Sequence, residues 1–248
     1  MPLTRTIHCR FYGALNRFLK STQRYRDFRY FVKGVPSIKD TLEALGVPHT
    51  QIDCIVVNSR SVRFSYQIRG GERIQVYPEA DRAKLRKAIR LKPKLSLNPK
   101  FVLDVHLGKL ARHLRLLGFD TLYEKEMEDA AIAQLGQRAG RIVLTRDLAL
   151  LKNKGIRRGH FVRATDPQKQ VREVVREFAL AGKMRPFRLC LVCNGTIRRV
   201  AKSRIVHRLP PLTKKYYQKF YHCPRCDKIY WQGTHYKQLV RLVNAVKH

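Results

Sequence analysis

Acidic residues are scarce in this 248-residue sequence: 18 Asp and Glu stand against 52 Lys and Arg, which gives a formal net charge of +34 at pH 7. Repulsion among so many like charges opposes compaction, and a polyanionic partner relieves it. Nucleic acid is the default partner of this kind, because it presents a dense row of phosphates. Hydrophobic content is ordinary at 44%, so the sequence predicts packed domains. Together with the charge, this predicts a folded protein that binds nucleic acid.

Long apolar runs are absent as well. No stretch approaches the ~18 apolar residues of a membrane-spanning helix. The start of the chain, "MPLTRTIHCRFYG", lacks the apolar core of a signal peptide. No basic amphipathic helix with a broad apolar face stands out, which disfavours a membrane surface as the polyanionic partner. We therefore expect a cytoplasmic protein with no membrane partner.

Cysteine is limited to six residues, and a cytosolic setting argues against a disulfide framework. Four of the six form two C-x-x-C pairs, Cys190 with Cys193 and Cys223 with Cys226. Four thiolates suit a closed, structural Zn²⁺ site, with a redox role for one pair as the weaker alternative. The 29 residues between the pairs are more than usual, and a long basic hairpin would fill that gap. Cys9 and Cys54 are expected in the core.

Residues 1–91 show the pattern of a β-grasp domain. Alternating residues in "TIHCRFYG" and "DFRYFV" predict a hairpin with a long connection, and "CIVVN" and "ERIQVYP" predict two further strands. Between them, "PSIKDTLEALG" predicts a helix that Ser37 caps and Gly46 ends. The order resembles the ubiquitin-like sulfur carriers, which act through a free C-terminal Gly-Gly. Because Gly70–Gly71 lies in a turn far from the C-terminus, we expect a scaffold or a module that binds a protein or further RNA.

The next segments are a predicted linker and an α/β domain. Residues 92–100 combine prolines and bases without periodicity, as linkers do. Residues 101–182 then alternate predicted strands ("FVLDV", "FDTLY", "RIVLT", "HFVRAT") with helices ("LGKLARHLRLLG", "EDAAIAQLGQRAG", "DLALLKNKG", "DPQKQVREVVREFAL"). Such βα repetition predicts a mainly parallel sheet with helices on its faces.

Three acids stand near the expected carboxyl edge of this sheet. Asp104 ends the first strand, Asp129 opens the helix before the third strand, and Asp147 follows that strand. Sites form at this edge, and converging carboxylates offer hard oxygen ligands to Mg²⁺ or Mn²⁺. The alternative is structural, because Asp129, Asp147 and Asp166 also stand at expected helix N-caps. Asp104 differs, since an acid within an apolar strand is costly unless it is paired or metal-bound.

Two stretches carry a family resemblance. "DAAIAQLGQRAGRIVLTRD" resembles the second half of PIN-domain nucleases, and "FVLDVHLGKLARHLRLLGFD" is similar to the mutator-seven C-terminal RNase family, a PIN-like group with a zinc ribbon. A ubiquitin-like domain commonly precedes that RNase, so the resemblance covers essentially the whole chain. It implies an α/β PIN-like three-layer domain between an α+β β-grasp domain and a zinc ribbon. It also implies hydrolysis of RNA phosphodiesters by Mg²⁺ or Mn²⁺ held on Asp104, Asp129 and Asp147.

The sequence departs from the family pattern at a fourth acid. Relatives often carry an acid before the glycine of "GRIVLTRD", where this chain has Ala139. PIN enzymes usually have a further acid before the helix-opening one, and the residues available for it are Asp120, Glu124, Glu126 and Glu128. The rival hypothesis is therefore a non-catalytic factor with a degenerate centre, which docks on structured RNA such as tRNA or ribosomal RNA.

Residues 183–248 are predicted to form the zinc ribbon and an RNA-binding segment. The last 68 residues, 181–248, hold 16 bases and one acid. Bases interleave with aromatics in "KKYYQKFYH" and "KIYWQGTHYK", which is typical of phosphate contact combined with base stacking. Trp231 fits packing and stacking equally, and His235 fits packing or RNA contact better than zinc binding. The predicted RNA contacts are Arg112, Arg198, Arg199, Lys202, Arg204, Lys214, Lys215, Trp231 and His235.

Overall fold

The fold is that of a computed structural model, which describes residues 4–85 and 87–247. The chain forms two compact units: residues 1–94 with 147–160, and residues 95–146 with 161–248. The first contains the predicted β-grasp domain, and the second contains most of the α/β domain together with the zinc ribbon. No helix in the described residues is long and apolar enough to cross a membrane.

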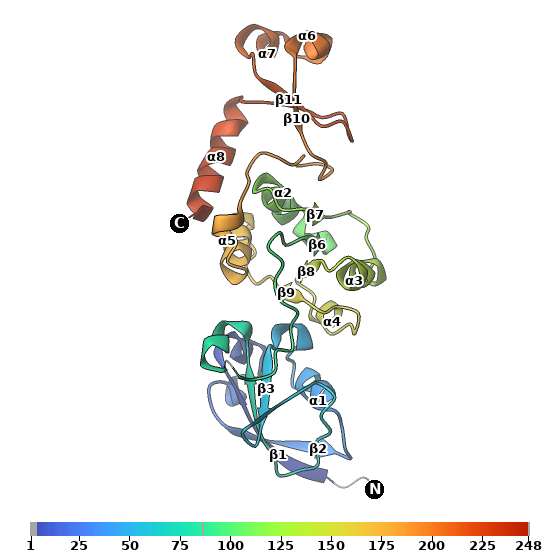
Figure 1. The fold of residues 1–248 in the computed structure, drawn as a ribbon, viewed down its shortest axis with the longest axis vertical. Coiled ribbons are helices and arrows are strands. Elements are labelled where there is room, and N and C mark those ends of the chain that lie inside the picture. The colour runs from blue at the N-terminus through green and yellow to red at the C-terminus, as the bar shows by residue number, and fades with distance from the viewer. Residues whose placement is uncertain (1–3, 86, 248) are drawn as a thin grey trace. The chain divides into compact units, whose positions relative to one another are not determined.

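A five-stranded mixed sheet forms the first unit, in the order β2-β1-β5-β3-β4 (Figure 1). Its strands are β1 (Thr4–Phe11), β2 (Phe28–Lys33), β3 (Cys54–Val57), β4 (Arg60–Val62) and β5 (Arg73–Tyr77). β1 pairs antiparallel with β2 across a long connection that holds η1 (Gly13–Phe18) and η2 (Ser21–Gln23), and it runs parallel to β5. This is the predicted β-grasp topology.

The core of the first unit follows from the alternation along its strands. Ile7, Cys9 and Phe11 on one face of β1 are buried, and they pack with Leu42 of α1 (Ile38–Ala44). Ser37 caps α1 by accepting a hydrogen bond from the backbone N of Asp40. The predicted cap and the predicted core position of Cys9 are both confirmed.

The first unit also includes the segment from Asp147 to His160, which carries α4 (Leu148–Leu151). The three residues of η3 (His49–Gln51) form hydrogen bonds with backbone carbonyl oxygens of this segment. His49 contacts that of Ile156 at 2.9 Å, Thr50 that of Leu151 at 3.3 Å, and Gln51 that of Gly159 at 3.1 Å. The Arg158 guanidinium pairs with Glu79 of η4 (Glu79–Leu85) at 2.5 Å. A stretch that the sequence analysis placed in the α/β domain is therefore held by the β-grasp domain.

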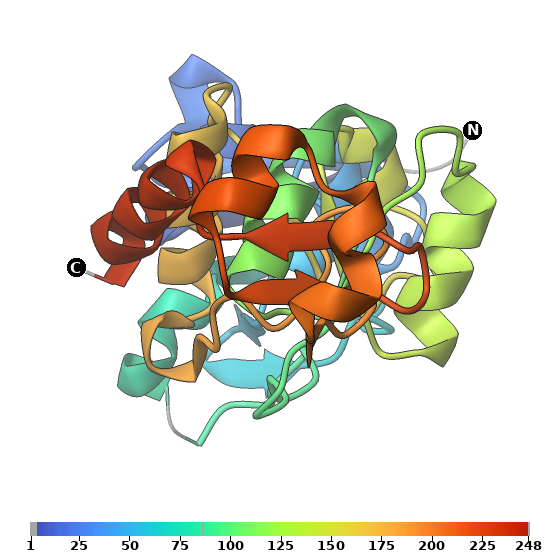
Figure 2. The same cartoon turned by 90° about the horizontal axis from the view of Figure 1, so that it is seen from above.

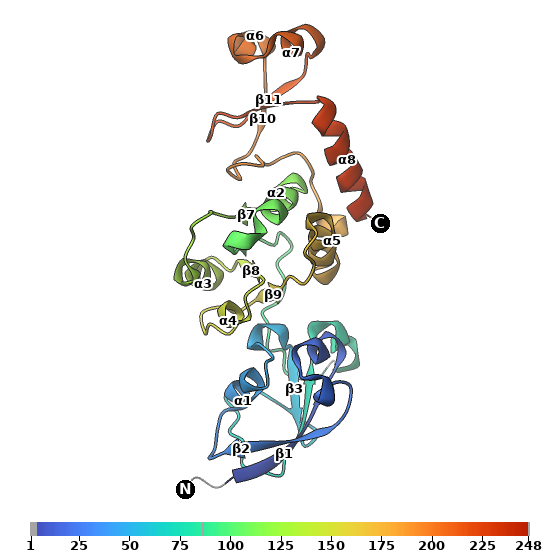
Figure 3. The same ribbon diagram turned by 180° about the vertical axis from the view of Figure 1, so that it is seen from behind.

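The second unit is built on a sheet with the order β7-β6-β8-β9, although the first two residues of β9 belong to the segment assigned to the first unit. Its strands are β6 (Phe101–Leu103), β7 (Thr121–Leu122), β8 (Ile142–Thr145) and β9 (Gly159–Phe161), and β6 runs parallel to both β7 and β8. Phe101, Leu103 and Leu144 pack in one core with α2 (Gly108–Leu116) and α5 (Pro167–Glu177). Val102 and Val143 alternate with these residues along the strands and so face the other side of the sheet. On that side, α3 (Asp129–Arg138) packs against β6 and β8 (Figure 3). The predicted three-layer arrangement is confirmed.

The C-terminal helix α8 (Thr234–Lys247) returns to the core of the α/β domain, beside α5 (Figure 1). Its Val243 and Val246 are buried there, and Leu239 and Leu242 pack against the same core. The sequence pattern predicted a ribbon and RNA-binding segment over all of residues 183–248, and this helix was not predicted. Its apolar residues do follow helical spacing, but the bases among them are also typical of an RNA-binding segment.

The ribbon between α5 and α8 has three antiparallel strands, β10 (Arg198–Val200), β11 (Phe220–His222) and β12 (Ile229–Trp231). The connection between β10 and β11 forms α6 (Lys202–Ile205), η7 (Val206–Arg208) and α7 (Pro211–Tyr216), which Figure 2 shows from above in orange. Ile205, Leu209 and Phe220 make a small separate core. The gap between the cysteine pairs is thus filled by helices as well as by strands.

Candidate functional site

Asp104 follows β6 directly, and only 6% of it is exposed. Its Oδ2 accepts hydrogen bonds from Thr145 Oγ1 at 2.6 Å and from the backbone N of Arg146 at 3.4 Å. Its Oδ1 accepts one from the backbone N of His106 at 3.1 Å, at the start of η5 (Val105–Leu107). The parallel pairing of β6 with β8 brings these donors to the carboxyl edge of the sheet. Hydrogen bonding offsets the cost of burying this acid.

The other two predicted acids have different surroundings. Asp129 is exposed and is the first residue of α3, and the N-cap before it, Glu128, makes no capping hydrogen bond with its side chain. Asp147, in the first unit, is exposed and caps α4 by accepting a hydrogen bond from the backbone N of Ala149 at 2.7 Å. Asp147 therefore has the capping role that the structural alternative predicts, and Asp129 does not.

In the part of the chain that the structure describes, one group of three or more His, Cys, Asp or Glu residues brings its ligand atoms within 4.8 Å of one another, and it consists of the four paired cysteines. Asp104 and Asp129, which both lie in the second unit, are not gathered in this way. The carboxylate oxygens of Asp104, Asp129 and Asp147 have the hardness that Mg²⁺ and Mn²⁺ prefer, so the chemistry of the donors fits such an ion.

Asp120 lies at the opposite edge of the sheet from Asp104, because it precedes β7 whereas Asp104 follows the parallel strand β6. Its carboxylate accepts two hydrogen bonds from Arg141, at 2.9 and 3.0 Å, and one from Asn194 Nδ2 at 2.7 Å. Burial raises the pKa of Asp120, but the hydrogen bonds from Arg141 and Asn194 outweigh it and hold that pKa below its usual value. Asp120 thus joins the start of β8 to the turn after the first cysteine pair. Among the other acids considered for a fourth ligand, Glu124 is exposed and follows β7, at the same edge of the sheet as Asp104.

Arg146 is a positioning residue that the sequence analysis missed. Its Nη1 donates to the carbonyl oxygens of Arg163 at 3.1 Å and Ala164 at 2.6 Å. Glu173 of α5 accepts hydrogen bonds from the backbone N of the same two residues, at 3.0 and 2.9 Å. The end of β8 is therefore tied to the turn before α5. In the sequence, an Arg beside an Asp looks like an exposed charged pair, so no local pattern indicates this role.

The four cysteines form a closed sulfur cluster. The Sγ atoms of Cys190 and Cys226 are 3.4 Å apart, as are those of Cys193 and Cys223. A tetrahedral zinc with Zn–S bonds of about 2.3 Å places its sulfurs about 3.8 Å apart. The cluster needs only a slight expansion to reach that geometry, so it fits one Zn²⁺ ion. His235 does not belong to the group.

Both cysteine pairs share one backbone conformation. Asn194 and Asp227 directly follow the second cysteine of each pair, with φ of 66° and 59°. Asn and Asp tolerate this left-handed region better than most residues. Gly195 leaves room for the sulfurs, because a Cβ atom there would lie 3.1 Å from Cys223 Sγ. These turns explain why "CLVCNG" and "CPRCDK" suit a metal site.

Cys190 is poised to be a thiolate. Burial raises its pKa, but hydrogen bonds with the Tyr230 hydroxyl at 3.0 Å and from the backbone N of Cys193 at 3.5 Å outweigh burial and lower the pKa to about 6. The Tyr230 hydroxyl also accepts a hydrogen bond from the backbone N of Leu191 at 3.1 Å, which fixes its position. Tyr230 therefore supports the cluster, a role that its aromatic-rich context in the sequence did not reveal.

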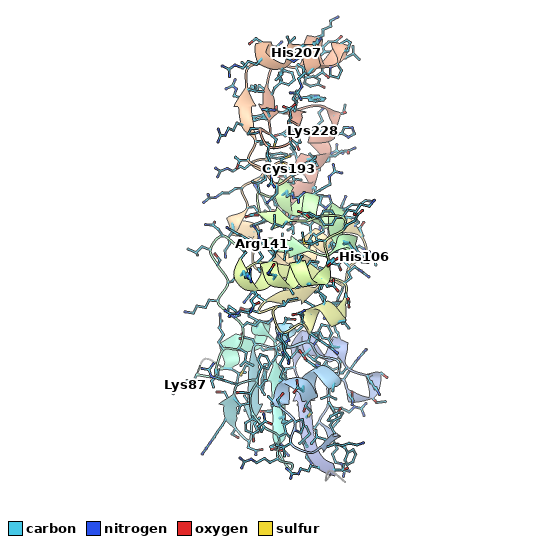
Figure 4. All side chains as sticks on the ribbon, turned by 90° about the vertical axis from the view of Figure 1, so that its right-hand side faces the viewer. Lys87, His106, Arg141, Cys193, His207 and Lys228 are labelled. Atoms are coloured by element: carbon cyan, nitrogen blue, oxygen red, sulfur yellow. The ribbon has the colours of Figure 1, made fainter. Side chains whose placement is uncertain are left out.

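The first cysteine pair is fastened to the α/β sheet. Arg115 of α2, which is 3% exposed, donates to the carbonyl oxygens of Leu191 at 3.2 Å and Val192 at 2.7 Å, and its Nε donates to the Thr121 carbonyl at 2.9 Å. Asn194 Oδ1 accepts a hydrogen bond from the backbone N of Thr121 at 3.0 Å. Figure 4 shows Cys193 at this junction between the ribbon strands and α2.

The predicted RNA contacts are distributed over the second unit. Arg112, Arg198, Arg199, Arg204, Lys215 and His235 are exposed, and Lys214 is half-buried. Lys202 Nζ donates to the Lys214 carbonyl and to Gln218 Oε1, so part of its role lies within the ribbon. Trp231 packs against the small core around Phe220 and is also partly exposed, so it fits both packing and base stacking.

Comparison with known proteins gives two matches that together span most of the chain. Residues 99–243 match the family model described as Mut7-C RNAse domain, and residues 4–84 match the one described as Mut7-C ubiquitin. No curated protein and no solved structure matches the chain. The first match covers both the α/β sheet with Asp104 and the ribbon with its four cysteines.

Proposed function

The chain belongs to the Mut7-C RNAse domain family, and from this premise we propose that it is an RNA-binding ribonuclease that hydrolyses phosphodiester bonds with the help of a divalent metal ion. The observation that carries the proposal is the buried carboxylate of Asp104 at the carboxyl edge of a parallel sheet. This edge is where catalytic and ligand-binding residues gather in such folds.

Asp104, Asp129 and Asp147 are the proposed ligands of Mg²⁺ or Mn²⁺. A bound divalent ion supplies an activated water and neutralises charge that develops on the phosphate. Thr145 and the backbone N of Arg146 hold the Asp104 carboxylate in one orientation, so it meets an ion without rearranging. Glu124 is the proposed fourth acid, because it follows β7 at the same edge of the sheet.

The four cysteines are proposed to hold one structural Zn²⁺ ion. With four thiolates the coordination shell is closed, which leaves no position for water or substrate. The ion fixes the turns that Arg115 and Asn194 fasten to the sheet. The basic surface of the ribbon then binds the RNA backbone, and the β-grasp domain is proposed to bind a protein or further RNA.

A non-catalytic RNA-docking function is the second candidate. It is favoured by Ala139 in place of a family acid, and by the finding that Asp104 and Asp129 belong to no group of three or more ligands among the described residues. Such a factor binds structured RNA and leaves it intact.

Cleavage assays with two acid variants separate the candidates. Asp104→Asn removes the charge at the proposed centre but keeps the size of the side chain. Asp166→Asn is the matched control, because Asp166 is an exposed cap of α5 and Asn caps equally well. The nuclease proposal predicts that Asp104→Asn lowers Mn²⁺-dependent RNA cleavage about 100-fold or more and that Asp166→Asn does not. Equal cleavage by the two variants would contradict it.

A further inference from the structure

A basic pocket of about 240 Å³ lies in the second unit, on the far edge of the sheet from Asp104. Its wall combines the segment before β6, the turn between α2 and β7, and the chain on both sides of the first two cysteines. Lys100 and Asp120 precede the parallel strands β6 and β7, whereas Asp104 follows β6. Because four residues of extended chain span about 13 Å, the pocket and the acidic centre are separate sites.

The pocket attracts anions. Four cationic side chains line it, those of Lys100, Lys183, Arg185 and Arg188. The one acid in the lining, Asp120, is already paired with Arg141, which donates two hydrogen bonds to it. Arg185 and Arg188 are both exposed, and guanidinium groups bind phosphate oxygens in pairs. A phosphate group is the ligand that this charge pattern fits best.

Apolar groups in the pocket match the rest of a nucleotide. Phe119, Leu189 and Leu97 line it together with the cations, and Leu97 is 81% exposed, so its side chain is accessible to a ligand in the pocket. Asn98 and Thr196 add polar side chains that can pair with a ribose hydroxyl. The volume is below the roughly 300 Å³ at which drug-sized pockets begin, so it suits one small unit of a longer ligand.

We propose that this pocket is an RNA exosite, which holds one nucleotide of a single-stranded segment of the substrate. Arg185 and Arg188 bind its phosphate, and Leu97 covers its base or sugar. The proposal rests on the proposed RNA substrate and adds where a second part of that RNA is held. A nucleotide bound here is not the one that is cut, because the pocket lies on the edge opposite Asp104.

The pocket depends on the cysteine cluster. Leu189 and Thr196, which both line it, form an isolated bridge with each other on the two sides of the first cysteine pair. When the cluster is loaded with zinc, its turn holds these two residues together. Loss of the metal should therefore weaken RNA binding at the pocket even though no pocket residue is a ligand.

A charge-reversal variant tests the exosite in the full-length, zinc-loaded protein. Arg185→Glu with Arg188→Glu should keep the fold, because only backbone groups of these residues are used, namely the bond from Arg185 N to the Leu117 carbonyl and that from Ile197 N to the Arg188 carbonyl. The matched control is Arg172→Glu with Arg176→Glu on α5, which changes the charge equally at two exposed positions.

Fluorescence anisotropy with a labelled six-residue oligouridylate measures the affinity. The exosite predicts a loss of about tenfold or more for the pocket variant and less than about threefold for the control. Uridine monophosphate should compete with the probe more strongly than inorganic phosphate does. Equal losses in the two variants would show that only overall charge matters, and equal competition would reduce the site to a phosphate contact; either result overturns the proposal.

Cleavage kinetics distinguish the exosite from the nuclease proposal. The pocket variant should raise KM for a long RNA and leave kcat within about twofold, because it removes binding energy that is present throughout the reaction. Asp104→Asn should instead lower kcat and leave binding of the oligouridylate unchanged. Binding losses confined to the pocket variant support the exosite even if wild type cuts no RNA, in which case the nuclease proposal alone fails.

Discussion

The guanidinium of Arg115 donates a 2.7 Å hydrogen bond to the carbonyl oxygen of Val192, and thereby joins a helix of the α/β domain to the turn that carries Cys190 and Cys193. Arg115 is almost fully buried, and burial lowers the pKa of its guanidinium. The same side chain also donates a hydrogen bond to the carbonyl oxygen of Thr121, the first residue of β7. The ribbon is therefore part of the structure of the α/β domain, and zinc binding and domain stability should depend on each other.

Removing this guanidinium should destabilise the second unit. Arg115→Leu leaves the carbonyl oxygens of Thr121, Leu191 and Val192 without their donor, and the expected loss in the free energy of unfolding is on the order of 3 kcal/mol. Urea unfolding of the zinc-loaded protein measures it. Arg112→Leu, at an exposed position of the same helix, should cost less than about 0.5 kcal/mol. Equal costs would mean that the Arg115 bonds contribute nothing beyond those of a surface residue.

Zinc should be present at one ion per chain. Elemental analysis of purified protein should find this stoichiometry in wild type and in His235→Ala, and less than half of it in Cys226→Ser. Because thiols must lose protons to bind the ion, zinc affinity should fall as the pH is lowered. Wild-type protein that carries no zinc, or His235→Ala that loses it, would contradict the assignment of the four cysteines as the complete ligand set.

Asp147 can be tested both for its cap and for its proposed role as a metal ligand. Asp147→Asn should keep the cap of α4 and thus the melting temperature, whereas Asp147→Ala should cost about 1 kcal/mol. If Asp147 is also a metal ligand, the two variants should lose cleavage equally, by about 100-fold or more, with little change in RNA affinity. Normal cleavage by Asp147→Asn together with destabilisation by Ala would leave Asp147 a cap and nothing else.

The first unit should lose stability in acid through Glu43. Burial raises the pKa of Glu43, but the hydrogen bond and charge of His49, 2.6 Å away, outweigh it and lower the pKa below 4.5. A lowered pKa means that this stabilisation is complete above the unfolded-state pKa and is lost as the pH falls through the folded-state pKa. Glu43→Gln should therefore be less stable than wild type at pH 6, and the difference should shrink toward pH 3.

A matched variant makes that comparison specific. Asp27→Asn removes an acid whose ion pair with Arg10 is exposed, so the free energy of unfolding should change by less than about 1 kcal/mol at either pH. Thermal or urea unfolding at the two pH values gives both results. A difference between wild type and Glu43→Gln that stays constant with pH would show that the Glu43–His49 pair does not act through its charge.

Local patterns predict most elements of the fold. Alternation on β1 and the Ser37 cap of α1 follow from residues that are neighbours in the sequence, and the spacing of each C-x-x-C pair indicates its turn. Arg115 with Val192 and Asp120 with Asn194 are different, because these partners are more than seventy residues apart and no local signal links them. The residues that fasten the ribbon to the sheet were therefore not predictable from the sequence.

Two further features could not be predicted, because they too depend on partners that are distant in the sequence. His49, Thr50 and Gln51 are polar, yet they are buried where they bind the segment after Asp147. Asp120 looks like a further catalytic acid by position, yet Arg141 and Asn194 occupy its carboxylate. Burial of a polar side chain depends on distant partners, so composition and periodicity do not reveal it.

The central claim, that this chain cuts RNA with a divalent ion, is tested most directly by cleavage of a labelled single-stranded RNA as Mn²⁺ is titrated into zinc-loaded wild-type protein. The proposal predicts products that appear at a rate which rises with Mn²⁺ and saturates, and that disappear in Asp104→Asn while RNA binding persists. RNA that is bound tightly but stays intact at every concentration of Mn²⁺ or Mg²⁺ would contradict the nuclease and leave the RNA-docking factor.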